Sequence, residues 1–273
     1  MKTFIRWYGN KSRYIPILKK HFPTSFNTYI EPFVGSGSVF LNLQPKQWII
    51  NDKNKDLVNI WTHVSKNPKL IWKYYQSFQQ AFLPLSRREK LLFLRNLLET
   101  LISMKFTCKR AAYYLLVKFC SYMGLILIAN KYRIPSLDSK VFNDEKLYFL
   151  TDEYFDNLLN VHKYMKNSNG IIYNLDYKDI LKLANKDDFI FLDPPYGDDY
   201  TFQYNKDQNM SSSFEDELYQ QLKKLDDKGV KWMMTQANTS RMRKRFKDYK
   251  IYKFRVYRGH THSHSSELII KNY

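Results

Sequence analysis

The chain has 273 residues, of which 44% are hydrophobic, and a formal net charge of +18. The length suffices for one large α/β domain with an inserted subdomain, and the charge implies a polyanionic partner, nucleic acid rather than a membrane surface, with a lysine-rich solubility coat as the alternative. The chain has only two cysteines, Cys108 and Cys120, which excludes a disulfide framework and a cysteine metal site. No signal peptide and no apolar run of membrane-spanning length is visible, so we expect an intracellular, non-secreted protein without a membrane partner.

The charge is unevenly distributed along the chain. Residues 170–237 contain eight Lys and Arg against thirteen Asp and Glu, whereas the segments 1–56, 57–169 and 238–273 are each net positive. A catalytic centre that binds a cation, flanked by basic surfaces that hold a polyanion, would give this distribution.

After a short helix that Ser12 could cap, a predicted strand over 28–33 runs into the loop Gly35-Ser36-Gly37-Ser38 and then into another helix. Strand, glycine loop and helix together predict a cradle for a nucleotide, because glycines let the backbone approach a ligand closely. The position three after Gly37 is Phe40 rather than Gly or Ala, which departs from the dinucleotide fingerprint. The missing Gly-Lys-Ser/Thr excludes a triphosphate loop.

The next predicted strand, 48–52, ends in a carboxylate. Asp52 lies about as far beyond the glycine loop as the acid that binds ribose hydroxyls in nucleotide-binding folds. Loop and acid together predict a cofactor that contains adenosine.

Residues 57–169 have a helical and basic character, and we expect them to be an insertion into the α/β domain. Their apolar residues recur at helical spacing and are interpreted as core rather than as a cofactor site. Their basic side chains are candidate phosphate contacts, which position a nucleic acid without reading its sequence. These are Arg87, Arg88, Arg95, Lys105, Lys109, Arg110, Lys131 and Arg133.

The α/β pattern resumes at 170–174, and the apolar run 189–192 predicts a short buried strand that two prolines end. Asp193-Pro194-Pro195-Tyr196 then follows at the carboxyl end of this strand, where open α/β sheets bind ligands. The proline rings fix their φ angles and remove two N–H groups, so the Pro194 carbonyl is held outside any ladder. A carboxylate, a carbonyl and an aromatic ring suit a planar base with an exocyclic amino group, with Tyr196 stacked on its face. The alternative is an ordinary strand end with a turn and a surface tyrosine.

After the turn, the polar, serine-rich loop 197–213 lies where a lid would close. A strand over 230–235 precedes a very basic helix, and an antiparallel pair closes the chain. Three alternating histidines could be interpreted as a metal site, but a loop with incidental histidines is favoured and no metal is expected, because no cysteine or carboxylate clusters with them. They are His260, His262 and His264.

With these residues assembled, the chain resembles the Dam-type (D12 class, alpha group) DNA N6-adenine methyltransferases, whose cofactor motif precedes the catalytic motif with the target-recognition region between them. The resemblance runs from Trp7 to Tyr273. Residues 31–42, Glu-Pro-Phe-Val-Gly-Ser-Gly-Ser-Val-Phe-Leu-Asn, are similar to the glycine motif of the family over twelve consecutive positions. Residues 7–11, Trp-Tyr-Gly-Asn-Lys, look like its N-terminal Trp-x-Gly-Gly-Lys element, and 267–273 resemble its closing strand.

The resemblance implies an α/β, Rossmann-like S-adenosylmethionine-dependent fold, with 1–56 and 170–273 as the catalytic domain and 57–169 as a mainly helical target-recognition subdomain. It implies methyl transfer from S-adenosylmethionine to N6 of an adenine extruded from double-stranded DNA. The implied catalytic residues are Asp193, Pro194, Pro195 and Tyr196. The implied cofactor-binding residues are Trp7, Tyr8, Gly9, Lys11, Pro32, Phe33, Gly35, Ser36, Gly37, Ser38, Asp52, Asp176, Tyr177 and Asp193. The expected DNA-binding residues are Arg87, Arg88, Arg95, Lys109, Arg110, Asn130, Lys131, Arg133, Arg241, Arg243, Arg245 and Arg258.

The chemistry of adenine agrees with these roles. N6 is a poor nucleophile because its lone pair is delocalised into the ring. Asp193 and the Pro194 carbonyl, as two acceptors, would localise that lone pair and aim it at the sulfonium methyl group. Asp193 is expected to orient N6 rather than to deprotonate it, because an ordinary carboxylate is too weak a base for a neutral amine.

The target-reading hairpin departs from the family. Residues 122–135 keep only a Gly and the terminal Ile-Pro, so the four-base target of the family is not carried over, and 255–260 replace its C-terminal Arg-Arg-Ser pattern. An RNA adenine methyltransferase is one alternative, and a nucleic-acid-binding protein that has lost catalysis is another, against which the intact Asp193, Gly35 and Gly37 argue. The sequence does not reveal whether a companion restriction nuclease exists.

Overall fold

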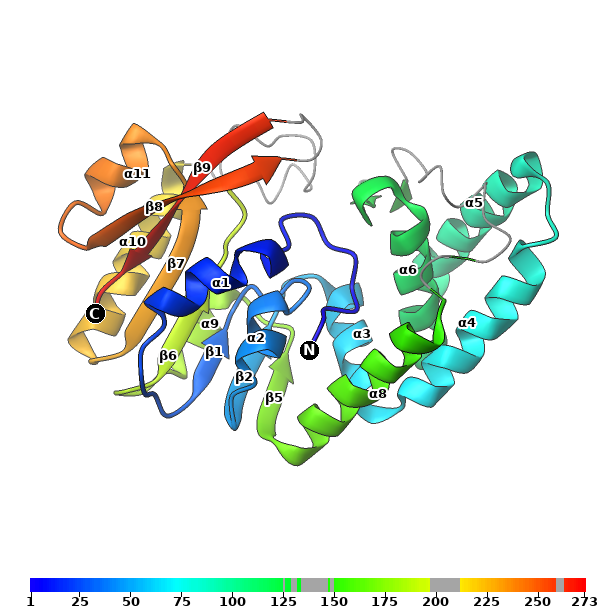
Figure 1. Ribbon diagram of the computed structural model, residues 1–273, viewed down its shortest axis with the longest axis horizontal. Helices are drawn as coiled ribbons and strands as arrows, with labels where there is room; N and C mark the ends of the chain where they lie inside the picture. Colours follow the sequence, from blue (N-terminus) through cyan, green and yellow to red (C-terminus); the bar gives the residue numbers. More distant parts are fainter. Residues whose placement is uncertain (125, 129–131, 134–146, 148–149, 197–211, 259–262) are drawn as a thin grey trace.

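The computed structural model describes residues 1–124, 126–128, 132–133, 147, 150–196, 212–258 and 263–273, and it shows a sheet between helices with a helical region beside it (Figure 1). The described sheet has the strand order β5-β2-β1-β6-β7-β9-β8. Its strands are β1 (Tyr29–Glu31), β2 (Gln47–Asn51), β5 (Asn169–Tyr173), β6 (Phe189–Leu192), β7 (Lys231–Ala237), β8 (Lys250–Arg258) and β9 (Ser263–Lys271).

Five of these strands form parallel pairs with one another, and β9 pairs antiparallel with both β7 and β8, so that β9 alone of the described strands of this sheet runs in the opposite direction. The chain starts at β1 in the centre, moves outward to β2 and β5, and then returns to β6 on the other side of β1. The sheet therefore changes direction between β1 and β6, and open α/β sheets bind their ligands beyond the carboxyl ends of the strands at such a point. The predicted α/β class is confirmed.

Strand β6 shows why its sequence is apolar without alternation. Phe189 and Phe191 pack into the hydrophobic cluster on one face of the sheet, whereas Ile190 and Leu192 pack into the cluster on the other. A parallel strand covered by helices on both faces needs apolar side chains at every position. On the Phe189 face lie α1 (Ile15–Leu18), α2 (Ser38–Leu43) and α3 (Lys55–Lys66), and on the Ile190 face lie α9 (Tyr177–Lys182), α10 (Ser212–Asp227) and α11 (Ser240–Arg245).

The helical region follows α3 in the chain and returns to the sheet before β5. It contains α4 (Pro68–Phe82), α5 (Arg87–Ser103), α6 (Cys108–Cys120) and α8 (Asp152–Asn167), and the short antiparallel pair β3 (Leu127–Ile128) and β4 (Tyr132–Arg133). Side chains cap the helix starts by accepting backbone N–H groups, including Asn67 before α4 and a capping box of Ser86 and Glu89 before α5. The short 3₁₀ turns are η1 (Ser12–Tyr14), η2 (Lys19–His21) and η3 (Tyr122–Gly124).

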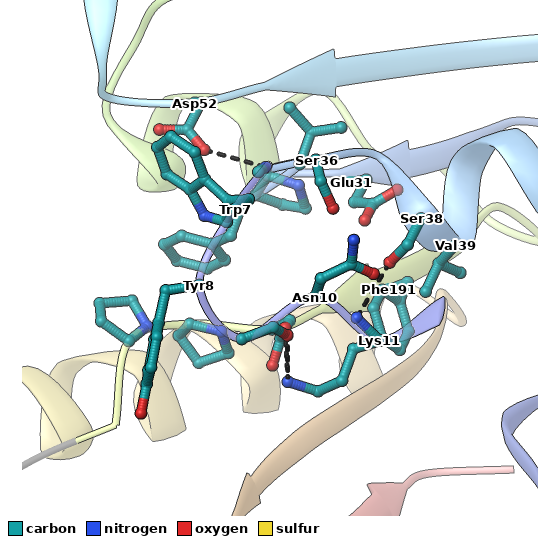
Figure 2. A pocket seen from close by; sticks show the side chains of 18 of the residues that line it. Trp7, Tyr8, Asn10, Lys11, Glu31, Ser36, Ser38, Val39, Asp52 and Phe191 are labelled. Carbon is teal, nitrogen blue, oxygen red and sulfur yellow. Dashed lines mark hydrogen bonds and ion pairs between the residues drawn. The ribbon is translucent and has the colours of Figure 1, made fainter. Parts of the chain in front are cut away.

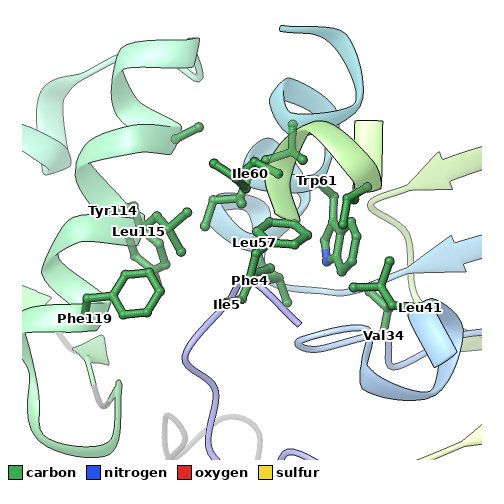
Figure 3. Close-up of a cluster of buried hydrophobic side chains, with 14 of the residues drawn as sticks. Phe4, Ile5, Val34, Leu41, Leu57, Ile60, Trp61, Tyr114, Leu115 and Phe119 are labelled. Atoms are coloured by element: carbon green, nitrogen blue, oxygen red, sulfur yellow. The ribbon is translucent and has the colours of Figure 1, made fainter. Parts of the chain in front are cut away.

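The core continues from the sheet into the helical region. Figure 3 shows Phe4 and Ile5 of the N-terminal segment among apolar side chains of α3 and α6. The Phe4 ring meets the edge of Trp61 on α3, with ring centroids 4.9 Å apart. The helices thereby hold the N-terminal segment against the glycine loop, and the proposed domain boundaries at 57 and 169 stay a prediction. None of the described helices is long and apolar enough to span a membrane.

Candidate functional site

A cavity of about 700 Å³ opens where the sheet changes direction, beyond the carboxyl ends of β1, β2 and β6. Its walls come from the N-terminal segment, the glycine loop, the start of α9 and the turn after β6. Figure 2 shows side chains of the N-terminal segment and of the glycine loop around this space, among them Trp7, Lys11 and Ser36. The cavity therefore gathers residues that lie far apart in the sequence.

The glycine loop forms the floor of this cavity in a backbone conformation that favours glycine. Gly35 has a φ of 48° and Gly37 a φ of 64°, both in the left-handed region. The N–H of Gly35 donates to Oδ2 of Asp52 over 3.1 Å, and the N–H of Asn54 donates to the other oxygen over 2.9 Å. Burial raises the pKa of the Asp52 carboxyl to about 6, although these N–H donors oppose the shift.

The Trp7 side chain lies over Gly35. A Cβ on Gly35 would lie only 3.0 Å from Nε1 of Trp7, so the glycine permits this contact. The ammonium of Lys118 lies 4.0 Å from the centroid of the Trp7 ring. Burial lowers the pKa of Lys118 to about 7, while Asp52 and Asp56 oppose the shift.

Aromatic rings form the wall near α9. Tyr177 is buried, with its ring centroid 5.4 Å from that of Phe33 and 5.2 Å from that of Phe214. The neighbouring Asp176 caps α9 by accepting the N–H of Lys178 over 3.1 Å. A wall of this kind suits a flat heterocycle such as a purine.

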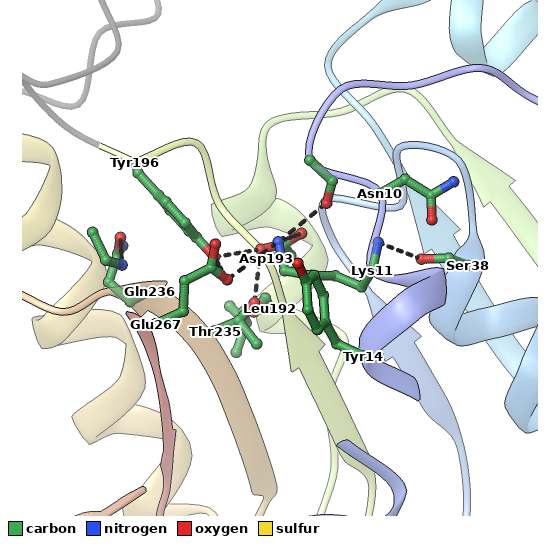
Figure 4. A network of polar contacts seen from close by, with 12 residues as sticks. Asn10, Lys11, Tyr14, Ser38, Leu192, Asp193, Tyr196, Thr235, Gln236 and Glu267 are labelled. Atoms are coloured by element: carbon green, nitrogen blue, oxygen red, sulfur yellow. Dashed lines mark hydrogen bonds and ion pairs between the residues drawn. The ribbon is translucent and has the colours of Figure 1, made fainter. Parts of the chain in front are cut away.

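Around the turn after β6, polar side chains converge on Asp193 (Figure 4). Nζ of Lys11 lies 2.8 Å from its Oδ2, and the hydroxyl of Thr235 donates to its Oδ1 over 2.7 Å. The Tyr196 hydroxyl lies 3.2 Å from the same Oδ1 and 2.9 Å from Oε2 of Glu267. Asp193 is thus held by groups from three separate parts of the chain.

The carboxylates keep the buried Lys11 charged. Burial pulls the pKa of Lys11 down, but Asp193 and Glu267 more than offset that effect, so its pKa is raised. Burial raises the pKa of Tyr196 well above its ordinary value, and the same two carboxylates act in the same direction. The site therefore combines a carboxyl group, a charged amine and a neutral phenol.

Comparison of the sequence with known protein families identifies the family of this chain. The sequence matches the D12 class N6 adenine-specific DNA methyltransferase family over residues 7–259. The chain belongs to this family. It is accordingly an adenine-specific DNA methyltransferase, which acts on DNA and requires a methyl donor.

Individual relatives agree with the family match. The Type II methyltransferase M1.LlaDCHI of Lactococcus lactis subsp. cremoris is 27% identical over 284 residues, which cover 100% of this chain and 96% of that protein. The DNA adenine methylase of Salmonella typhi is 26% identical over 199 residues, 71% of this chain and 65% of that protein. The Type II methyltransferase M.MjaIII of Methanocaldococcus jannaschii is 26% identical over 262 residues, 87% and 84% of the two chains.

The cavity of this methyltransferase brings together nearly all the residues that the sequence predicts for it. All four residues of the catalytic turn line it, as do all the predicted cofactor residues except Gly37. Gly37 lies behind the wall, where a Cβ would come within 2.4 Å of Cζ2 of the buried Trp61. The roles of the predicted catalytic and cofactor-binding residues stay predictions.

Sequence reasoning did not find three polar residues of the site. Thr235 and Glu267 come from β7 and β9, and strand pairing brings them to the turn. Glu267 begins the segment that resembles the closing strand of the family, but nothing in that segment indicates a contact with the turn. Glu31 lies inside the glycine motif, where its carboxylate accepts the Tyr29 hydroxyl over 2.7 Å. Burial raises the pKa of Glu31 well above its usual range, and the nearby Asp193 carboxylate adds to the shift.

One predicted DNA contact is wrong. Arg110 is only 4% exposed, and its guanidinium pairs with Asp56, with Nε 2.6 Å from Oδ1 and Nη2 3.1 Å from Oδ2. It also donates to the carbonyls of Leu101 and Met104. Arg110 therefore holds the turn between α5 and α6 against α3 and cannot reach a phosphate.

The other candidates for DNA contacts are placed in different ways. Arg87, Arg88, Arg95 and Lys109 are exposed on α5 and α6. On α11, Arg241 and Arg243 are exposed, whereas Arg245 is partly buried between Glu215 and Asp216. Arg133 ends β4 and Arg258 ends β8. Asn130 and Lys131 lie outside the described residues.

Two further predictions also fall partly outside the described residues. They are the lid, of which 197–211 are not described, and the histidine loop, of which 259–262 are not described. Within the described part of the chain, no group of three or more His, Cys, Asp or Glu is arranged to hold a metal ion.

Proposed function

We propose that this methyltransferase transfers a methyl group from S-adenosylmethionine to N6 of an adenine that is extruded from double-stranded DNA. The observation that carries the proposal is the joint position of the glycine loop and Asp193 on one cavity of about 700 Å³. A donor bound along the loop would present its methyl group toward the acid that receives the base. Residues 57–169 would form the target-recognition subdomain.

The residues of the cavity fit this donor. Gly35 leaves room beside Trp7 that a Cβ would fill, and Asp52 offers a carboxylate for ribose hydroxyls at the carboxyl end of β2. Phe33 and Tyr177 offer apolar faces for the adenine ring of the donor. When bound, S-adenosylmethionine supplies an electrophilic methyl group on a positively charged sulfur.

The turn would prepare the acceptor amine. Asp193 and the Pro194 carbonyl accept the two N6–H groups and draw N6 toward tetrahedral geometry, which localises its lone pair for in-line attack on the methyl carbon. Formation of the N–C bond would break the C–S bond, whose electron pair would stay on sulfur. N6 would then be cationic and would lose a proton to solvent water, which restores a neutral amine. Tyr196 contributes an aromatic face that offsets part of the lost base stacking.

Labelled S-adenosylmethionine and duplex DNA test this proposal. After incubation and digestion to nucleosides, we expect the label in N6-methyladenine, with structured RNA as the comparison acceptor. Asp193→Ala should abolish transfer and leave DNA binding intact. Label on cytosine, label in RNA alone or no label at all would contradict the proposal.

A further inference from the structure

Lys118 joins the helical region to the wall of the cavity. It lies near the end of α6 and is only 5% exposed. Its Nζ lies 4.0 Å from the centroid of the Trp7 ring and donates to the carbonyl oxygen of Gly124 over 2.6 Å. Trp7 lines the cavity, whereas neither Lys118 nor Gly124 does. One buried side chain thus contacts both a residue of the cavity wall and a turn outside the cavity.

A second set of contacts attaches the same turn to the N-terminal segment. Gly124 ends η3 with a left-handed φ of 72°, and a Cβ there would come within 2.5 Å of the Arg6 carbonyl oxygen. The Arg6 guanidinium donates to the Phe119 carbonyl over 3.0 Å. The backbone that precedes Trp7 is therefore packed against the end of α6 and against η3, so the position of Trp7 depends on both.

Trp7 transmits this dependence to the donor site. Its Nε1 lies 3.0 Å from where a Cβ on Gly35 would be, so the ring rests on the backbone of the glycine loop. A shift of the ring changes the shape of the space beside that loop. Resting on the function proposed above, we propose that Lys118 is a positioning residue for donor binding, which holds Trp7 in place from the helical region. The amine donates to Gly124 whether or not it is protonated, so this role does not depend on the charge of Lys118.

A purely structural role for Lys118 makes a different prediction. The bond to Gly124 would then only fasten η3 to the end of α6, and its loss would lower stability without changing the affinity for the donor. If Lys118 instead acts through Trp7, removing either side chain weakens donor binding, and removing the second adds little. Donor binding by single and double variants therefore separates the two roles.

The experiment is a calorimetric titration of S-adenosylmethionine, without DNA, into the wild type, Lys118→Met, Trp7→Leu and the double variant. We expect Lys118→Met to raise the dissociation constant of the donor about 2- to 30-fold, the range for a side chain that modulates a neighbouring site. In the Trp7→Leu background, Lys118→Met should have little further effect. Lys90→Met is the matched control and should bind the donor like the wild type, because Lys90 is a buried lysine of the helical region whose Nζ lies over the ring of Phe82.

Two results of the titrations would overturn the inference. One is wild-type donor affinity in a folded Lys118→Met, and the other is an equal loss of affinity with and without Trp7. Thermal unfolding shows which variants are folded. A wild-type protein that binds no S-adenosylmethionine would instead refute the proposed function itself.

Amide hydrogen exchange of the wild type tests the inference without a substitution. If Lys118 links Trp7 to η3, donor binding must also stabilise η3, because coupling between two sites is reciprocal. The donor should therefore slow exchange of the Gly124 N–H, which donates to the Ser121 carbonyl over 3.1 Å. This slowing should exceed that of the Lys90 N–H near the start of α5. An equal or smaller slowing at Gly124 would overturn the inference even if Lys118→Met did not fold.

Discussion

Alanine at the two glycines of the loop should separate stability from donor binding. At Gly37 the new Cβ would lie 2.4 Å from Cζ2 and 2.5 Å from Cη2 of Trp61, which is fully buried and cannot move aside. The left-handed φ of 64° costs an alanine about 1–2 kcal/mol, and overpacking adds about 1–3 kcal/mol. We expect Gly37→Ala to lower the free energy of unfolding by about 2–5 kcal/mol, or roughly 4–10 °C in melting temperature for a chain of this size.

At Gly35 the new Cβ would meet Nε1 of Trp7 at 3.0 Å, and that ring is only partly buried and can give way. Gly35→Ala should therefore lower the free energy of unfolding only by the cost of the left-handed backbone conformation, about 1–2 kcal/mol. It should also weaken donor binding, because the new methyl group pushes Trp7 from the cavity wall. Calorimetric titration with the donor and thermal unfolding of both variants measure the two effects. A stable Gly37→Ala, or a larger loss of donor affinity in Gly37→Ala than in Gly35→Ala, would refute the reasoning.

Four further predictions concern charged groups. Because burial raises the pKa of Asp52 to about 6, donor affinity should fall as the pH drops through 6, and this dependence should vanish in Asp52→Asn in the same titration. The pKa of Lys118 is lowered to about 7 in the folded protein, so the unfolded chain binds more protons than the folded protein between pH 7 and 10.5. The free energy of unfolding, measured with denaturant, should therefore rise with pH over that range. It should rise less in Lys118→Met. Arg110→Ala should destabilise the fold by about 3–5 kcal/mol because it removes the guanidinium that pairs with the buried Asp56 carboxylate. Arg95 is exposed, so Arg95→Ala should leave stability unchanged. The variant should bind DNA more weakly, and its DNA-binding constant should depend less steeply on salt concentration.

A different result would contradict each of these predictions. A donor affinity that is flat between pH 5 and 7 in the wild type would remove Asp52 from ribose binding. Equal pH profiles of stability for the wild type and Lys118→Met would mean that Lys118 is not the group that titrates. Arg110→Ala with wild-type stability, or Arg95→Ala with an unchanged salt dependence, would contradict the placement of those side chains.

Local sequence patterns predicted the parts of the fold that depend on neighbouring residues. The uninterrupted apolar run 189–192 is β6 with the same bounds, because only a strand covered on both faces needs such a run. The glycine loop was predictable for a similar reason: Gly35 and Gly37 adopt left-handed φ angles that other residues rarely accept.

The parts that sequence reasoning missed depend on contacts between distant residues. Arg110 has the spacing of an exposed basic residue, but Asp56, which buries it, lies 54 positions earlier. Glu267 reaches Tyr196 across 71 positions only because β9 pairs beside β7. The local sequence predicts that Tyr196 offers its ring to a base, but no local pattern indicates that its hydroxyl bonds to two carboxyl groups.

The most direct test is a crystal structure of the protein with duplex DNA and a non-reactive analogue of S-adenosylmethionine. We predict that the analogue lies between Gly35 and Asp193, and that an extruded adenine presents N6 to Asp193 and to the Pro194 carbonyl. An analogue bound elsewhere, or an adenine that stays paired in the duplex with no base at the turn, would contradict the central claim.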